Sequence, residues 1–328
     1  MLITIISMKS KSALLIGILY KGTKYELKGC HNDVDNYNSF IKKRGYNDIT
    51  VLKDTSTLKS KSNSKFKVGQ PTKDKIIEGF NHLLNQARNK GVREFIIQFS
   101  GHGIKHTVRP ISGTRTSNGY DTALIPSDFE KEGVVTQSLI SAYLYKFPEG
   151  CRVLLIFDCC HSGTMTNLPY MLIHSTRFEK LNSLDFKANL LCIAGCTRDG
   201  KSVDVYNLNR DKSWSGALSW AILESLKIGE KITVTKILGN IRKLMIKYGY
   251  NQVPQITATW KFSPKEILAF DKKSLFFRNE NIKNLNTTEL INRLVAPKTV
   301  KELRAWRKEK RRIEKTGKLK LVKDKKTK

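Results

Sequence analysis

Four short apolar segments, separated by stretches of helical periodicity, constrain the fold of this chain more than any other feature. They are ALLIGIL at 13–19, EFIIQFS at 94–100, VLLIFD at 153–158 and NLLCIAG at 189–195. Each is rich in Leu, Ile or Val and lacks polar alternation, which is typical of parallel strands buried on both faces. ITVL at 49–52 is a fifth candidate strand.

Five segments between and after these strands have the periodicity of amphipathic helices. In segment 72–91, Thr72 is a suitable N-cap, and one face carries Ile76, Ile77, Phe80, Leu83 and Leu84. The other four segments are 33–45, 136–147, 217–226 and 233–249. Strands that alternate with helices predict an α/β sandwich, in which helices flank both faces of a mainly parallel central sheet.

Two motifs that contain histidine or cysteine follow neighbouring predicted strands. SGHG occupies 100–103 and DCCHSG occupies 158–163. In parallel sheets, ligand sites lie beyond the carboxyl ends of the strands, so we expect the two motifs to be neighbours. A thiol paired with an imidazole can act as a nucleophile, and the glycines beside His102 allow a sharp turn with N–H groups free for an oxyanion. The alternative is a turn histidine beside two buried cysteines, and spacing does not choose between Cys159 and Cys160.

Composition excludes several other classes of protein. The 328 residues include 59 Lys+Arg and 29 Asp+Glu, a net charge of +30, which favours contact with polyanions and says little about fold. Six cysteines without a CxxC pair argue against a disulfide framework and a structural zinc site. The apolar start is too short for a signal peptide, and no run approaches the roughly 20 apolar residues of a membrane span. We therefore expect a chain of a reducing, intracellular compartment without membrane contact.

Six ordered motifs between about residues 12 and 262 resemble those of the metacaspases, which are caspase-like cysteine peptidases. The motifs are ALLIGILYKGTKYELKGCHNDVDNYNSFI, SGHG, DTALIPSD, DCCHSG, NLLCIAGCTRDGKSVD, and the pair SGALSWAIL with NQVPQITAT. The resemblance implies a caspase-like sandwich. It also implies a cysteine endopeptidase that cleaves through a Cys–His dyad and a thioester acyl-enzyme.

The resemblance also implies roles for individual residues. His102 matches the catalytic histidine and Cys160 the nucleophile, while Cys159 fills a variable position. Gly103 is the candidate oxyanion donor. We expect His161 and His106 to be structural or exposed.

Four further residues match the pocket for the substrate side chain that precedes the cut: Cys30, Asp33, Ser100 and Asp158. Two carboxylates suit an Arg or Lys side chain and would repel an acidic one. The alternative for Asp33 is a solvated residue that caps the helix starting there.

Many metacaspases use calcium, and the resemblance marks Asp121 and Asp128 as possible ligands. The acidic positions that would follow are occupied by Thr136, Gln137 and Ser138. Calcium needs several hard, mostly charged oxygens, so we expect no required cofactor and weak or absent calcium dependence.

The resemblance divides the chain into a large-subunit-like region (1–180), a small-subunit-like region (181–270) and a basic extension (271–328) that we expect to be partly disordered or helical. The only segment between the cysteine motif and the next strand is short, 171–187, and it offers candidate self-cleavage sites at Arg177, Lys180 and Lys187.

The expected partners are protein substrates with exposed Arg or Lys, cleaved by a monomer. Two alternatives are a catalytically silent caspase-fold binding protein and a nucleic-acid-associated protein. The latter draws on residues 298–328, which hold fifteen Lys/Arg against four Asp/Glu. This tail would allow nonspecific polyanion contact and leaves a nuclear location open.

Overall fold

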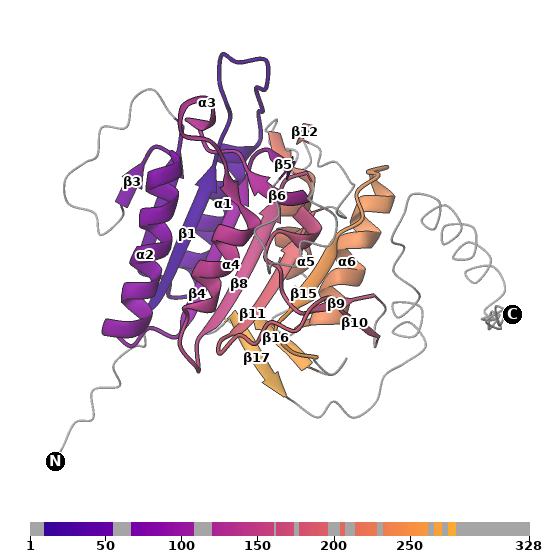
Figure 1. Cartoon of the computed structure of the whole chain (residues 1–328). Coiled ribbons are helices and arrows are strands. Elements are labelled where there is room, and N and C mark those ends of the chain that lie inside the picture. The colour runs from indigo at the N-terminus through magenta and orange to yellow at the C-terminus, as the bar shows by residue number, and fades with distance from the viewer. Residues whose placement is uncertain are drawn as a thin grey trace, which may run out of the picture.

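A nine-stranded sheet organises the chain in the computed structural model (Figure 1). The structure describes residues 10–54, 67–107, 120–160, 162–173, 177–195, 204–206, 214–227, 232–261, 266–270 and 275–279. The strand order is β10-β9-β15-β11-β8-β4-β1-β2-β3. The central strands are β1 (Lys11–Gly17), β2 (Asp48–Lys53), β4 (Glu94–Ser100), β8 (Arg152–Asp158) and β11 (Asn189–Ala194).

The sheet is mainly parallel, as predicted. β11, β8, β4, β1, β2 and β3 (Lys67–Gly69) all run parallel to one another. β15 (Gln255–Ala258), β9 (Tyr170–Leu172) and β10 (Phe178–Lys180) are antiparallel additions at one edge.

Helices cover both faces of this sheet, which confirms the sandwich. One layer holds α1 (Cys30–Lys42), α5 (Ala217–Lys227) and α6 (Val234–Lys247), and the other holds α2 (Lys73–Asn89) and α4 (Gln137–Tyr145) (Figure 1). Alternate residues of one strand enter opposite layers: Ala13 and Leu15 pack with α1, whereas Leu14 and Ile16 pack with α2. Such strands are buried on both faces, which explains their unbroken apolar sequences.

The five predicted strands and five predicted helices are all present. The structure also contains short strands that were not predicted. β5 (Gly103–Thr107), β6 (Tyr120–Leu124) and β7 (Val135–Thr136) form a small sheet beside the site, with the short helix α3 (Phe129–Glu132) between β6 and β7. β12 (Asp204–Tyr206) pairs with β13 (Trp214–Gly216). None of the helices in these described stretches is long and apolar enough to cross a membrane.

Five residues near the start of the expected basic extension form a strand. β14 (Ile232–Thr233), β16 (Glu266–Phe270) and β17 (Leu275–Asn279) form an antiparallel sheet, so residues 275–279 are a strand. The physical reason is the apolar run LFF, which pairs with EILAF of β16. Residues 280–328, including the basic run 298–328, lie outside the described residues.

Candidate active site

The two motifs singled out in the sequence meet at the carboxyl ends of adjacent strands. β4 and β8 are paired in parallel, and their last residues, Ser100 and Asp158, are register partners. The Gly101 N–H donates to the Asp158 carbonyl at 3.4 Å. The segment that contains His102 and the segment that contains Cys160 therefore begin side by side, at the adjoining carboxyl ends of β4 and β8.

Gly103 brings these two segments into direct contact. A Cβ at Gly103 would lie 2.2 Å from the Cys160 carbonyl oxygen and 3.0 Å from Cys159 Sγ. Neither Gly101 nor Gly103 has a positive φ, and the Gly101 N–H is engaged by Asp158. The Gly101 N–H is therefore not free for an oxyanion, whereas the expected oxyanion role of Gly103 stays a prediction. Glycine is needed at 103 because the backbones approach too closely for a side chain.

The two adjacent cysteines occupy different environments. Cys159 is fully buried in the apolar cluster around α2 and α4, whereas Cys160 is partly exposed. The other described cysteines are Cys30, Cys151 and Cys192, and all are buried free thiols. Burial raises the pKa of Cys151 and raises that of Cys192 to about 12, so both remain protonated at neutral pH. His161 and Cys196 lie outside the described residues, and His106 is described only as a backbone position of β5.

His102 is held by the loop that follows β1. Its Nε2 lies 2.8 Å from the Tyr25 carbonyl oxygen, and its backbone N–H donates to the Tyr20 hydroxyl at 2.9 Å. A carbonyl only accepts, so the contact with Tyr25 is a hydrogen bond when Nε2 carries the proton. Nδ1 of the neutral ring is then the basic nitrogen. Tyr20 and Tyr25 have no recognisable sequence signal, because they lie in a loop without periodicity.

Asp33 and Asp158 converge on the start of α5. The Gly216 N–H donates to both oxygens of Asp33 at 3.0 and 3.1 Å, and the Ser219 N–H donates to Asp158 Oδ2 at 2.8 Å. A Cβ at Gly216 would lie 2.8 Å from Asp33 Oδ2 and 2.2 Å from Asp158 Oδ2. The two carboxylates therefore flank one glycine at a helix N-terminus, where N–H groups and the helix dipole favour negative charge.

Asp33 is not a solvated cap, and that alternative is wrong. α1 begins at Cys30 after Gly29, and Asp33 is only 1% exposed. Tyr37, four residues further along the same helix face, was missed; its pKa is raised by burial and by the two nearby carboxylates. The expected pocket residues Cys30 and Ser100 are also buried, and Ser100 Oγ accepts from Gln98 Nε2 at 2.7 Å.

The candidate calcium ligands are engaged by the protein. Asp121 is buried; it accepts from Ser138 Oγ at 2.8 Å, from Ser138 N at 3.2 Å and from Thr122 N at 2.9 Å. Asp128 accepts from the Lys73 N–H at 2.9 Å. Among the described residues no group of three or more His, Cys, Asp or Glu is arranged to hold a metal ion. Both candidate ligands therefore already accept hydrogen bonds from the protein, and weak or absent calcium dependence stays a prediction.

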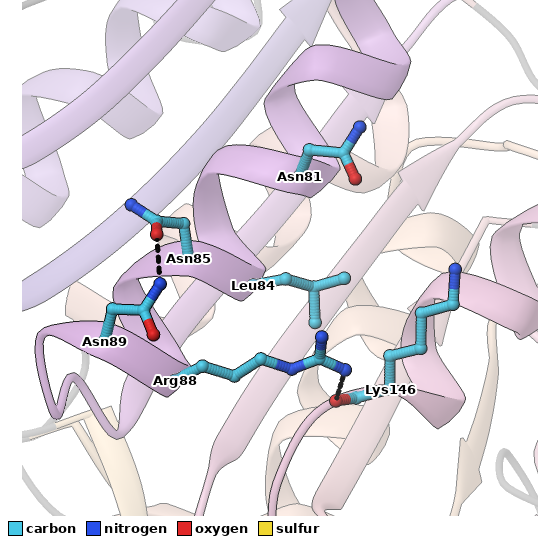
Figure 2. A pocket seen from close by; sticks show the side chains of 6 residues that line it. All are labelled: Asn81, Leu84, Asn85, Arg88, Asn89 and Lys146. Atoms are coloured by element: carbon cyan, nitrogen blue, oxygen red, sulfur yellow. Dashed lines mark hydrogen bonds between the residues drawn. The ribbon is translucent and has the colours of Figure 1, made fainter.

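A recess elsewhere on the molecule is unrelated to this site. It has a volume of about 370 Å³, and Figure 2 shows its lining residues: Asn81, Leu84, Asn85, Arg88, Asn89 and Lys146. α2 ends at Asn89, shortly before β4 begins at Glu94. The recess therefore lies near the amino end of β4, whereas the site lies at the carboxyl end of this strand. Its lining contains neither a thiol nor an imidazole.

The fold and the site define a caspase-like sandwich with a thiol and an imidazole at adjoining strand ends, the class of caspase-like cysteine peptidases. Residues 11–169 match the family model of the metacaspase peptidase C14 domain. Metacaspase-2 of Trypanosoma brucei brucei is 30% identical over 265 residues, covering 75% of this chain and 72% of that protein. The chain therefore belongs to the metacaspases, which are cysteine-type endopeptidases.

Two further matches bear on activity and fold. The inactive metacaspase-4 of Trypanosoma brucei brucei is 26% identical over 262 residues, covering 75% of this chain and 71% of that protein. The solved structure of protein GSU0716 from Geobacter sulfurreducens is 21% identical, with a TM-score of 0.52, covering 78% of this chain and 95% of that one. The latter likeness concerns the fold alone.

Proposed function

We propose that this metacaspase cleaves peptide bonds after Arg or Lys, with Cys160 as nucleophile and His102 as general base and acid. The observation that carries the proposal is the close contact of Gly103 with the Cys160 carbonyl. It brings the backbone of Cys160, whose side chain is partly exposed, against the residue that follows His102. The buried neighbour Cys159 faces the core instead.

The chemistry requires only these two side chains and water. His102 accepts the Cys160 thiol proton, and the thiolate attacks the carbonyl carbon of the scissile bond. The C–N bond then breaks, and the imidazolium gives its proton to the leaving amine, which leaves a thioester on Cys160. Water attacks the thioester as His102 removes a proton from it; the thiol is regenerated and the carboxyl product leaves.

The preference for Arg or Lys rests on the paired carboxylates of Asp33 and Asp158. A cationic side chain would gain charge-assisted hydrogen bonds from them, and an acidic one would meet repulsion. Both carboxylates are nearly inaccessible, at 1% and 4% exposure. A substrate side chain therefore contacts these two carboxylates only when the protein segments that bury them move apart.

A peptide-library assay tests nucleophile and specificity together. Wild type should cleave after Arg or Lys and leave Asp-terminated peptides intact, and Cys160→Ala should lose about 1,000-fold or more of the rate. Cys159→Ala is the matched control, because it removes an adjacent but buried thiol and should stay active. Cleavage by folded Cys160→Ala, or a preference for Asp, would contradict the proposal.

Calcium is not required for this activity. The support is that Asp121 already accepts hydrogen bonds from Ser138 and Thr122, and that Thr136 and Gln137 bring no charged oxygen. Rates measured with calcium and with a chelator should agree within about twofold, given the weak site expected of so few charged ligands. Stimulation by an order of magnitude would reject this part of the proposal.

A catalytically silent binding protein is the alternative, because one relative is named inactive. The same assay separates the two. A silent protein would fold yet cleave no peptide of the library, with or without calcium.

A further inference from the structure

The loop between β1 and α1 contacts the His102 ring through the Tyr25 carbonyl and the His102 backbone through the Tyr20 phenol. The Tyr20 hydroxyl accepts from the His102 N–H at 2.9 Å and donates to the Ile125 carbonyl at 2.7 Å. The Tyr20 and His102 rings are 4.8 Å apart. A Cβ at Gly101 would lie 2.9 Å from the same hydroxyl, so the chain leaves room for the phenol beside the histidine. Tyr20 therefore fixes both the backbone and one face of His102.

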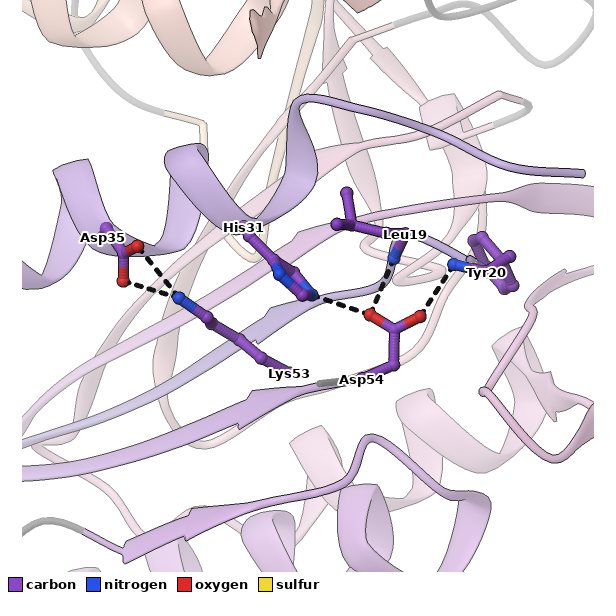
Figure 3. Close-up of polar contacts among 6 residues, drawn as sticks. All are labelled: Leu19, Tyr20, His31, Asp35, Lys53 and Asp54. Atoms are coloured by element: carbon purple, nitrogen blue, oxygen red, sulfur yellow. Dashed lines mark hydrogen bonds and ion pairs between the residues drawn. The ribbon is translucent and has the colours of Figure 1, made fainter. Parts of the chain in front are cut away.

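Tyr20 adopts a backbone conformation that needs support. Its φ is 51°, in the left-handed region that bulky residues rarely occupy. Asp54 provides the support, as Figure 3 shows: its Oδ2 accepts from Tyr20 N at 2.7 Å, and its Oδ1 accepts from Leu19 N at 2.8 Å. One carboxylate thus orients two successive peptide groups.

Asp54 is itself anchored to α1. His31 Nε2 lies 2.7 Å from Asp54 Oδ1, and one helical turn further along α1, Asp35 pairs with Lys53 at 2.8 Å (Figure 3). Burial alone would raise the pKa of Asp54, but hydrogen bonds from His31, Leu19 and Tyr20 outweigh it and hold that pKa below its ordinary value. The group is therefore a carboxylate at neutral pH and accepts all three contacts.

We propose that Asp54 is a positioning residue for the catalytic histidine and acts through Tyr20. The carboxylate keeps Tyr20 in its left-handed conformation, and the Tyr20 hydroxyl then keeps the His102 backbone in register with Ile125. Neither side chain is assigned contact with substrate. The inference rests on the proposed role of His102, and it predicts that Asp54 and Tyr20 affect catalysis as one unit.

Two conservative substitutions test this unit in the full chain. Tyr20→Phe keeps the ring and removes the hydroxyl; it should lower kcat about tenfold and change KM less than twofold, since only orientation is lost. Asp54→Asn should lower kcat in the same direction. Because both substitutions act through Tyr20, the kcat of the double variant should equal that of the less active single variant. The two losses in kcat should not multiply.

Matched controls separate positioning from general damage. Tyr46→Phe removes another buried hydroxyl, one without a hydrogen-bond partner in the described part of the chain, and Asp35→Asn alters the exposed neighbour pair. Both should keep wild-type kcat. His31→Gln is a milder perturbation of Asp54 and should lower kcat less than Asp54→Asn, which keeps the test available if Asp54→Asn folds poorly. Thermal unfolding of every variant reports folding.

A second readout does not depend on substrate. The iodoacetamide alkylation rate of Cys160, located by fragment-ion mass spectrometry, depends on its thiolate population and thus on the imidazole. It should fall in His102→Ala and, less strongly, in Tyr20→Phe and Asp54→Asn. If the wild type cleaves no peptide but the alkylation rates fall in these variants as expected, the proposed function is wrong and the positioning role of Asp54 is supported. Folded Tyr20→Phe that equals Tyr46→Phe in both readouts, or a double variant whose losses multiply, would overturn the inference.

Discussion

Gly103 is the residue whose replacement should affect the site most directly. An alanine Cβ there would lie 2.2 Å from the Cys160 carbonyl oxygen, which is backbone and cannot swing away. The two strand ends must separate, so Gly103→Ala should lower kcat about 100-fold, as displacements near 1 Å do in other active sites.

The matched control for this change is another strand glycine, Gly69. A Cβ there would meet only Leu52 Cδ2, at 3.4 Å. Gly69→Ala should keep wild-type kcat, measured on an Arg-terminated fluorogenic peptide. If Gly103→Ala retained full kcat with an unchanged melting temperature, the contact between Gly103 and Cys160 would not be the feature that assembles the site.

Some residues of the site could be predicted from the sequence, and others could not. His102 and the adjacent pair Cys159 and Cys160 could be located because they follow apolar strands, and strand ends are where parallel sheets gather polar groups. Strand position did not choose between the two cysteines; only the resemblance to metacaspases favoured Cys160. Tyr37 could be located by helical spacing, because it lies four residues after Asp33 on the same helix face. Tyr20 and Tyr25 could not be located, since their contacts with His102 depend on how a loop folds back after β1. A left-handed tyrosine has no local sequence signal.

At the scale of elements, Thr136 has a structural role that competes with any role in metal binding. Its Oγ1 accepts from the Leu139 N–H at 3.2 Å and caps α4, as Thr72 and Thr233 cap α2 and α6. Thr136→Ala should therefore lower the free energy of unfolding by about 1 kcal/mol in urea denaturation.

Thr136→Ser serves as the control, because serine caps as well as threonine and should leave stability nearly unchanged. The loss in Thr136→Ala should be the same with chelator present. An alanine variant as stable as wild type would show that this cap contributes nothing measurable to α4.

Long elements were predictable, and short ones were not, for one physical reason. A helix such as α2 or a strand such as β4 carries its own burial pattern in the residues that it contains. β9 and β10 have three residues each, and only the pairing of β9 with β15 and of β10 with β9 defines them as strands. Local sequence cannot reveal a partner that lies about 80 residues away.

At the scale of the molecule, the two subunit-like regions are interleaved within one sheet. β11 pairs in parallel with β8, and β15 pairs with β9, so strands of region 181–270 lie between strands of region 1–180. The segment that joins the regions is irregular and mostly exposed from Leu181 to Lys187. All three candidate cleavage residues are exposed; Arg177 and Lys180 flank or belong to β10, whereas Lys187 lies in this irregular stretch.

A cut in this joining segment should leave the molecule in one piece. β11 keeps its ladder to β8 and β15 keeps its ladder to β9, and the apolar cluster around α1, α5 and α6 spans both regions. The expected result is two fragments that co-elute in native gel filtration and separate only in denaturant. The measurement uses Cys160→Ala, which cannot process itself under the proposed mechanism, with a recognition site for an added protease inserted between Asn182 and Asp185. The uncut variant provides the reference elution volume. Fragments that elute separately without denaturant would mean that the covalent link, and not the shared sheet, holds the two regions together.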